Sequence, residues 1–335
     1  MILKIRKRML TSIVLVTVVA ALLYSIFYLF LGLLYVEPLK AAPSWVNDTL
    51  IVKVNVTNYA PKVVGVVVDD STPSPADEIN LVSGSVRRVF CNGTVVDWNG
   101  KDDIVAVNAT LYYNKNKSTS QNDMNEHYSN RSCALVRSYI YNETYTCGFN
   151  VWFFANNGTW YCNMSAWDNA TADFRHMQAF NSSIDLVKVN PLYGLEVPPL
   201  INFGELALNA ESNPHKVVNV TNTGNMKIDL NLWGYGGTKD YRVEPVENNL
   251  SMKCTMGNIS IRNLRFDTNQ SVDPWTSMTN LSGQRFNPKV VNFNLAQRRS
   301  ETTNSTNNTY WKIKIPQYTA KGQCNGTVVF VATVG

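Results

Sequence analysis

Histidine is scarce in this chain, and its few copies stand far apart. There are three in 335 residues, His127, His176 and His215. The sequence also has no Cys-x-x-Cys pair, no phosphate-binding loop, no Gly-x-Ser-x-Gly turn and no His-Glu-x-x-His motif. These absences argue against a zinc site made by cysteine and histidine, and they leave no recognisable setting for catalysis. We therefore expect a protein that is not an enzyme and needs no cofactor.

Charge is also sparse, since only 16% of the residues are charged. Four of the 30 basic residues precede residue 9, namely Lys4, Arg6, Lys7 and Arg8. The remaining 26 nearly balance the 25 acidic residues. A near-neutral body has no general electrostatic attraction for a polyanion, so nucleic acid is not an expected partner.

Residues 9–36 contain no charged side chain at all and are almost wholly apolar. A helix of these 28 residues is about 40 Å long, more than a bilayer core needs. The run exceeds the apolar region of about 7–15 residues in a cleaved signal, although Lys40-Ala41-Ala42-Pro43 resembles a cleavage site. Basic residues precede the run, so the positive-inside rule places the N-terminus in the cytoplasm and residues 37–335 outside. We predict a basic tail and a single-pass signal-anchor helix over 1–40, with the cell membrane bilayer as partner of residues 9–36.

Acceptor sites for N-linked glycans are the strongest pattern in the chain. With 40 Asn and 49 Ser plus Thr, about six Asn-x-Ser/Thr sites are expected by chance. The sequence has 19, and all lie beyond the apolar run. The acceptors are Asn47, Asn55, Asn92, Asn108, Asn116, Asn130, Asn142, Asn157, Asn163, Asn169, Asn181, Asn219, Asn249, Asn258, Asn269, Asn280, Asn304, Asn307 and Asn325. Both the excess and the placement predict a glycoprotein with an exterior C-terminal part.

The six cysteines are an even number on the predicted exterior side, so disulfides are expected. Cys254 and Cys324 are the only pair in the C-terminal half, which predicts a bond between them. Cys91, Cys133, Cys147 and Cys162 allow three connectivities. A local arrangement, Cys133 with Cys147 and Cys91 with Cys162, is slightly favoured, because a short connection around Asn142 can bring the first two opposite each other.

Alternating apolar residues between turn signals predict many short strands. In the first part these are Leu50–Val56, Val63–Val68, Val86–Val96 and Ile104–Tyr113, followed by a long polar loop over 114–130. The segments Tyr145–Phe154 and Thr159–Trp167 flank Asn157-Gly158, a favoured two-residue turn, and predict a hairpin with Phe153 opposite Cys162. In that register Cys147 is too far from Cys162 to bond to it.

Proline punctuates the chain at Pro191, Pro198 and Pro199, which predicts a domain boundary there. The expected domains are 41–190 and 191–335. Strands are predicted in the second at Ile201–Leu208, Lys216–Thr223, Lys227–Trp233, Trp311–Ile315 and Thr327–Val334, around a polar stretch over 267–309. No segment beyond the anchor has a helical period, so the predicted fold class is all-β, with two β-sandwiches behind one transmembrane helix.

Five segments are together similar to archaeal secreted immunoglobulin-like domains. They are Trp152–Trp160, Phe203-Gly204, Val218–Asn225 with its Asn-Thr-Gly-Asn ending, Leu230–Gly234 and Cys324–Ala332. The resemblance covers about residues 85–335. It implies immunoglobulin-like sandwiches on a cell surface and brings no activity with it. Tyr145-Thr-Cys147 also resembles the tyrosine corner of immunoglobulin domains, which implies a Cys91–Cys147 bond as the alternative connectivity.

One acidic turn carries oxygen ligands at alternating positions around a glycine. In Asp97-Trp98-Asn99-Gly100-Lys101-Asp102-Asp103 the oxygens of Asp97, Asn99, Asp102 and Asp103 resemble part of a calcium loop, without its distal glutamate. Asp168 and Asp173 can add ligands if the two loops meet. The favoured interpretation is nevertheless a solvated turn held by its own side chains, with no metal.

The leading functional hypothesis is a membrane-anchored, N-glycosylated cell-surface protein with a structural or interaction role. One alternative is a filament subunit that adds Leu50–Val56 or Thr327–Val334 to a neighbour's open sheet edge, so that other copies or other surface proteins are partners. Another is a carbohydrate-binding adhesin that uses Trp98, Trp152, Trp160 and Trp167 as a platform, although packing within the sheets is the favoured role for most of them.

Overall fold

The structure is a computed structural model of the chain, and it describes residues 2–34, 50–70, 77–117, 120–168, 185–238, 248–270 and 274–335. The chain divides into two compact units, Met1–Val56 and Thr57–Gly335.

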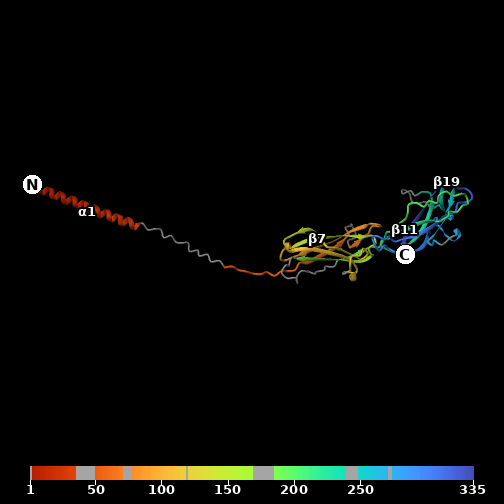
Figure 1. The fold of residues 1–335 in the computed structure, drawn as a ribbon, viewed down its shortest axis with the longest axis horizontal. Coiled ribbons are helices and arrows are strands. Elements are labelled where there is room, and N and C mark those ends of the chain that lie inside the picture. Colours follow the sequence, from red (N-terminus) through yellow and green to blue (C-terminus); the bar gives the residue numbers. More distant parts are fainter. Residues whose placement is uncertain are drawn as a thin grey trace. The chain divides into compact units, whose positions relative to one another are not determined.

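The first unit contains the helix α1 (Ile2–Leu34), which confirms the prediction of one apolar N-terminal helix (Figure 1). Its stretch Leu15–Leu33 has a mean hydropathy of 2.3 and is long and apolar enough to cross a membrane. Apolar side chains on all sides of this stretch are exposed, so the helix packs against no protein core among the described residues. A helix that is apolar all round is suited to lipid or to a protein interior.

The segment Leu50–Val56 does not form the predicted strand, and that prediction was wrong for the single chain. Its β-branched residues favour extended backbone, but a strand also needs a partner for its N–H and C=O groups. None of the described strands pairs with it. Leu50, Ile51, Val52, Val54 and Val56 are therefore 80–87% exposed.

The second unit begins with a first sheet pair, made by residues 62–189 (Figure 1). One sheet has the order β1 (Lys62–Asp69), β3 (Val86–Val96), β7 (Asn142–Trp152) and β6 (Ala134–Ser138). The other has the order β2 (Glu78–Ile79), β9 (Asp185–Val189), β8 (Gly158–Asp168), β4 (Ile104–Tyr113) and β5 (His127–Asn130). Short 3₁₀ turns occupy Lys101–Asp103 and Lys115–Lys117. The predicted bounds of β3 and β4 are confirmed.

A shared core holds these two sheets together. Alternate residues of β3 and β8 are buried, so each sheet turns one apolar face inward. Trp160 fills the core with no exposed surface, and Met164 packs in the same cluster. Burial of such side chains supplies about 1.5–3 kcal/mol each before the cost of ordering the chain.

The predicted hairpin between β7 and β8 was wrong, because the two strands belong to different sheets. Phe153, Phe154 and Ala155 follow β7 and are all buried, at 2%, 0% and 0% exposure. Three consecutive buried residues cannot alternate between two faces, so the chain crosses the core here instead of folding back within one sheet. The Asn157-Gly158 turn signal is local, and the burial of these aromatic side chains outweighs it.

Three disulfides link the strands, and they join Cys91 to Cys162, Cys133 to Cys147, and Cys254 to Cys324. The Cys91–Cys147 bond implied by the immunoglobulin resemblance is not the one formed. Cys91 and Cys147 are cross-strand neighbours in one sheet, but Cys91 bonds across the core to β8.

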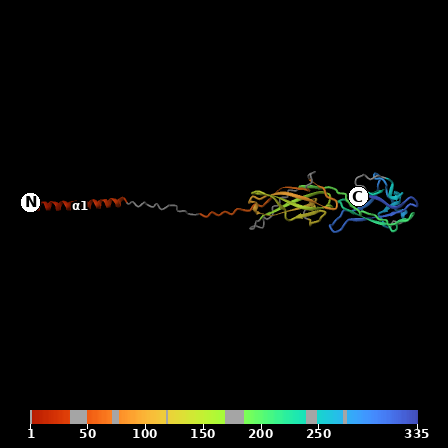
Figure 2. The same ribbon diagram turned by 90° about the horizontal axis from the view of Figure 1, so that it is seen from above.

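A second sheet pair is made by residues 195–334 (Figures 1 and 2). One sheet has the order β10 (Leu195–Glu196), β11 (Lys216–Asn222), β18 (Thr306–Ile313), β15 (Leu264–Asp267) and β16 (Thr279–Asn280). The other has the order β14 (Asn258–Ser260), β13 (Leu250–Met256), β19 (Lys321–Val334), β12 (Ile228–Gly236) and β17 (Lys289–Leu295). Further 3₁₀ turns occupy Ile261–Asn263 and Trp275–Ser277. Trp311 is fully buried in the core between these sheets.

Two predictions, one of a strand and one of a loop, were wrong. Ile201–Leu208 is not a strand, because Asn202 accepts a hydrogen bond from the Gly204 N–H and Gly204 has a φ of +76°, which turns the chain. The predicted polar loop 114–130 ends in β5, which pairs with β4. The polar stretch 267–309 contains β16 and β17, and buried Phe293 and Leu295 hold β17 on the core.

A buried turn, Asn222–Asn225, connects the two sheet pairs. Asn225 has no exposed surface. Its Nδ2 donates to the carbonyls of Ala155 and Asn190 at 3.0 and 3.1 Å, and its Oδ1 accepts from the Leu192 N–H at 2.7 Å. No strand pairing among the described residues crosses from one sheet pair to the other. That the halves at 41–190 and 191–335 fold independently stays a prediction.

Candidate metal centre

The acidic turn after β3 is held by the side chain and the carbonyl of its first residue, Asp97. Asp97 follows the last residue of β3, and its Oδ1 accepts a hydrogen bond of 2.8 Å from the Asn99 N–H. Its carbonyl accepts one of 3.3 Å from the Gly100 N–H. Gly100 has a φ of +121°, which favours glycine, and the 3₁₀ turn that follows carries Asp103 back beside Asp97.

Three carboxylates meet at this end of the first sheet pair. One oxygen from each of Asp97, Asp103 and Asp168 lies within 4.8 Å of the others. Asp97 extends β3 of one sheet, whereas Asp168 ends β8 of the other sheet, beside Ile104 of β4. Both sheets therefore contribute to one site. Asp97 is 0% and Asp168 2% exposed, and Asp103 is half-buried.

The surroundings of Asp97 disfavour its charged form. Its Oδ2 is buried and has no hydrogen-bond partner. Burial raises the pKa of the Asp97 carboxyl above its usual value, and the negative charges of Asp103 and Asp168 raise it further. The N–H groups of Asn99 and Gly100 act in the opposite direction. A buried carboxylate oxygen without a partner is costly, which indicates that a cation can be held here.

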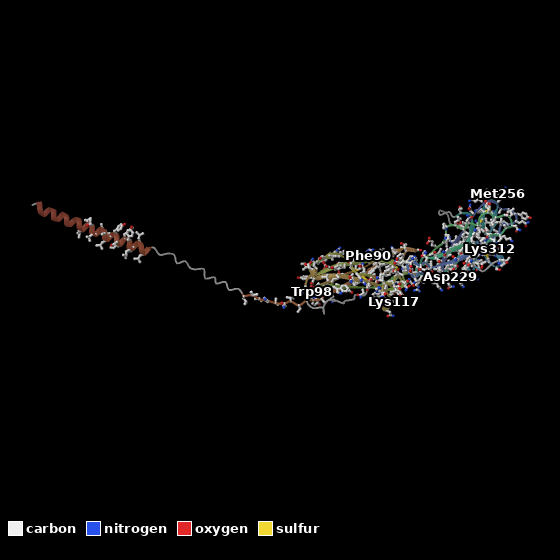
Figure 3. All side chains as sticks on the ribbon, viewed as in Figure 1. Phe90, Trp98, Lys117, Asp229, Met256 and Lys312 are labelled. Carbon is white, nitrogen blue, oxygen red and sulfur yellow. A yellow bond between two sulfur atoms is a disulfide. The ribbon has the colours of Figure 1, made fainter. Side chains whose placement is uncertain are left out.

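The segment that enters the second unit lies over the acidic cluster. The Asn58 amide donates to Asp168 Oδ2 at 2.5 Å, and the Tyr59 N–H donates to Asn99 Oδ1 at 2.5 Å. Sequence reasoning missed both residues, since a single polar residue in a connecting segment carries no recognisable signal. Figure 3 places Trp98 of the same turn at the end of the first sheet pair.

The structure brings some of the predicted calcium ligands together and places others elsewhere. It brings Asp97 and Asp103 together and adds Asp168. Asp102 points outward, and its exposed carboxylate pairs with Lys101 Nζ at 2.6 Å. The oxygen of Asn99 faces the Tyr59 backbone. Asp173 lies outside the described residues. The turn is held by one of its own side chains, as predicted, since Asp97 Oδ1 accepts from the Asn99 N–H. Its carboxylates are solvated at Asp102 but not at buried Asp97.

The predicted glycan acceptors are exposed or half-buried wherever the structure describes them. Sixteen of the 19 are described, and none of them is buried. Asn47, Asn169 and Asn181 lie outside the described residues. Asn125, Asn222 and Asn225 are buried at 0–3% exposure, and none of these three begins an acceptor site. Buried and acceptor asparagines thus fall into separate sets.

The four tryptophans proposed as a sugar platform do not share one surface. Trp160 is fully buried, and Trp152 stacks on Phe154. Trp98 is 61% exposed and contacts Tyr141. Trp152 and Trp160 also belong to different sheets. This arrangement favours the packing role over the adhesin platform.

No protein-family model matches the sequence, and no curated protein matches it. Among solved structures, the C-terminal domain of the Streptococcus agalactiae AgI/II polypeptide BspA is similar, with a TM-score of 0.23 and 10% identity, over 82% of this chain and 96% of that chain. A second structure, BspA_C_WT, has a TM-score of 0.21 and 10% identity over the same shares. TM-scores this low establish no shared fold, and the archaeal resemblance stays a prediction.

Proposed function

We propose that this chain is a membrane-anchored, N-glycosylated cell-surface protein whose two immunoglobulin-like β-sandwich domains have a structural or interaction role and no catalytic one. The observation that carries the proposal is the position of the acceptor asparagines. A glycan needs an acceptor that is accessible at the surface; none of the 16 described acceptors is buried, and 11 of them are exposed.

Two further features support an exterior location. Three disulfides hold the second unit, and disulfides persist in oxidising compartments. The apolar helix α1 stands at the N-terminal end behind a basic cluster, as in a signal anchor whose C-terminal part is outside.

Protease treatment of intact cells, followed by glycopeptide mass spectrometry, tests this proposal. We expect protease to degrade residues beyond the helix and to leave a small membrane fragment that contains Leu15–Leu33. We also expect glycans on more than half of the 19 acceptors. A protein protected until the cells are lysed, or found free in the medium from about Ala41, contradicts the anchored topology. Unmodified Asn163, Asn219 and Asn325 together contradict the glycoprotein.

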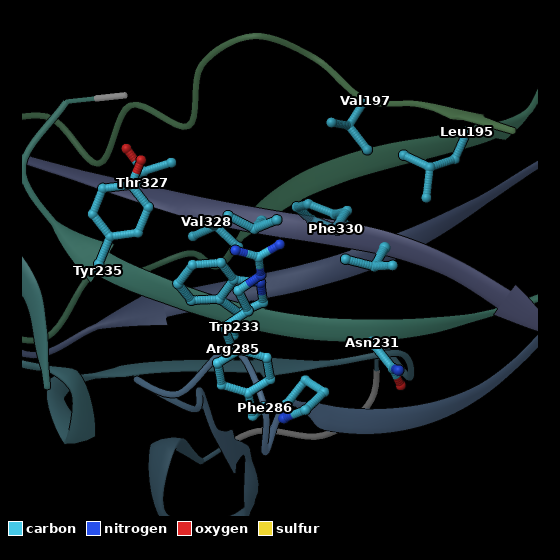
Figure 4. A pocket seen from close by; sticks show the side chains of 13 residues that line it. Leu195, Val197, Asn231, Trp233, Tyr235, Arg285, Phe286, Thr327, Val328 and Phe330 are labelled. Carbon is cyan, nitrogen blue, oxygen red and sulfur yellow. The ribbon is translucent and has the colours of Figure 1, made fainter. Parts of the chain in front are cut away.

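A second candidate function is assembly by strand addition, and we propose it because one sheet edge is open. β19 pairs with β13 over Lys321–Asn325 and with β12 over Gly326–Val334. Along Gly326–Val334 none of the described strands pairs with the other edge of β19. A cleft of about 620 Å³ contacts this stretch, and Leu195, Val197, Val328 and Phe330 line it (Figure 4). Val328 to Val331 all line the cleft, so it reaches both faces of the strand.

The occupant that fits this edge is Leu50–Val56 of a second copy. The segment is apolar, extended and 80–87% exposed at its large side chains. Its alternation places Leu50, Val52, Val54 and Val56 on one face, and Ile51, Lys53 and Asn55 on the other. A wholly apolar face against the cleft and a face with two polar residues outward suit an added edge strand.

Sedimentation of the full-length protein in detergent tests the assembly. We expect concentration-dependent oligomers from the native chain and monomers from the double variant Val52→Asp/Val54→Asp. The matched control Lys53→Asp changes the opposite face and is expected to assemble as before. A native chain that stays monomeric, or a double variant that assembles equally well, contradicts strand addition.

A further inference from the structure

We propose that the acidic cluster of Asp97, Asp103 and Asp168 binds one Ca²⁺ ion, and that the ion fixes the segment around Asn58 and Tyr59 on the end of the first sheet pair. The inference is independent of the proposed function, since it concerns a site and not a location or a partner.

The case for a cation rests first on geometry and burial. Carboxylates from two sheets and a 3₁₀ turn converge within 4.8 Å, and two of the three side chains are buried. Like charges at such distances repel each other, and water cannot screen them well inside a protein. The second, independent observation is the buried Oδ2 of Asp97, one of the three converging residues, which has no hydrogen-bond partner. A divalent cation at this place satisfies the oxygen and offsets the repulsion.

The chemistry of the donors selects calcium. All three are carboxylate oxygens, which hard cations prefer, whereas zinc prefers nitrogen and sulfur ligands. Oxygens that share one Ca²⁺ at about 2.3–2.6 Å lie at most about 5 Å apart, and the 4.8 Å limit of this cluster fits that requirement. Mg²⁺ demands a tighter, near-octahedral set and keeps more of its water. Three carboxylates leave coordination positions for water or a nearby carbonyl in the flexible geometry of calcium.

The hydrogen bonds around the acidic cluster explain what the ion controls. Asp168 accepts from the Asn58 amide, and Asn99, in the same turn as Asp97, accepts from the Tyr59 N–H. An ion that fixes Asp168 and this turn therefore also fixes the segment bonded to them. Without the ion, repulsion between the carboxylates loosens both attachment points. Calcium thus stiffens the point at which the chain enters the second unit.

Calorimetric titration of the full-length protein in detergent, after EDTA treatment, tests the site. We expect one Ca²⁺ per chain with a dissociation constant of about 0.1–1 mM, as in extracellular calcium modules. Asp97→Asn is expected to weaken binding at least tenfold, and Asp168→Asn to do the same. The matched control Asp102→Asn removes an exposed carboxylate of the same turn and is expected to bind as the native chain does.

Limited proteolysis tests the second part of the proposal. We expect Ca²⁺ to slow cleavage near Asn58 and Tyr59 several-fold in the native chain and in Asp102→Asn, but not in Asp97→Asn. Calcium binding without this protection overturns the stiffening role. No binding up to 10 mM, tighter binding of Mg²⁺ than of Ca²⁺, or equal binding by Asp97→Asn overturns the calcium site itself.

Discussion

Asparagine and acidic side chains in this chain take roles that depend on burial. The described asparagines of the predicted glycan sites are not buried. Buried Asn222 instead donates to three carbonyls and satisfies backbone that the strands leave unpaired. Glu143 illustrates the same rule for a charge. It is 6% exposed, and its two oxygens accept from Ser138 Oγ at 2.9 Å and Tyr145 Oη at 2.5 Å. Burial raises the pKa of the Tyr145 phenol, and Glu143 raises it further.

Tyr145→Phe removes one of these two donors from a buried carboxylate. We expect the variant to lower the free energy of unfolding by about 2 kcal/mol, because a hydrogen bond to a charged group is lost and Glu143 stays buried. Chemical denaturation measures the change. Tyr161→Phe is the matched control, since its hydroxyl makes no hydrogen bond within the described residues, and a change below about 0.5 kcal/mol is expected. Equal effects of the two variants refute the role of the Tyr145–Glu143 bond.

At the scale of elements, turns between strands decide how the sheets are joined. The turn Asn222–Asn225 is packed closely on both sides. A Cβ atom on Gly224 would lie 2.1 Å from the Leu192 carbonyl, so only glycine fits there. The Thr223 carbonyl accepts from the Gly84 N–H at 3.0 Å, and Thr223 Oγ1 lies 2.7 Å from Ser83 Oγ. The Asn-Thr-Gly-Asn motif thus acts as the joint of the two sheet pairs.

Asn225→Ala removes the centre of this joint. The Leu192 N–H and the Ala155 and Asn190 carbonyls lose a buried partner, so we expect a loss of about 2–4 kcal/mol in the free energy of unfolding. Thermal and chemical denaturation measure it. Asn219→Ala, on the exposed face of β11, is the control and is expected to change stability little when both proteins are made without glycans. A loss no larger than that of the control contradicts the stabilising role of Asn225.

At the scale of the whole molecule, disulfides connect segments that are far apart in sequence. Cys91–Cys162 and Cys254–Cys324 span 71 and 70 residues, and each lies within one sheet pair. Cys254 and Cys324 are cross-strand partners of β13 and β19. The loop between them includes the polar stretch 267–309, which contributes few residues to the core.

The double variant Cys254→Ser/Cys324→Ser opens this loop. In the chain-entropy model a loop of that length stabilises the fold by about 4 kcal/mol. We expect the melting temperature to fall by about 10 °C in differential scanning calorimetry of the full-length protein. Reduction of the native chain should produce a larger fall, because it opens all three bonds. A shift of less than 2 °C, or a Cys254 peptide linked to an N-terminal cysteine in non-reducing mapping, contradicts the prediction.

Local pattern by itself determined the apolar helix, the all-β character and the extents of β3 and β4, because period and composition act over a few neighbouring residues. Only the tertiary structure decided which strands pair. The burial of Phe153 and Phe154 places β8 in the other sheet. Leu50–Val56 stays unpaired because none of the described strands pairs with it. For the acidic cluster, too, the sequence determined one part and the tertiary structure the other. The sequence marked Asp97 and Asp103 and named Asp168 conditionally, but the burial that separates them from Asp102 depends on how the ends of β3, β4 and β8 meet. Long-range packing decides how these strand ends come together, and the local sequence pattern does not predict it.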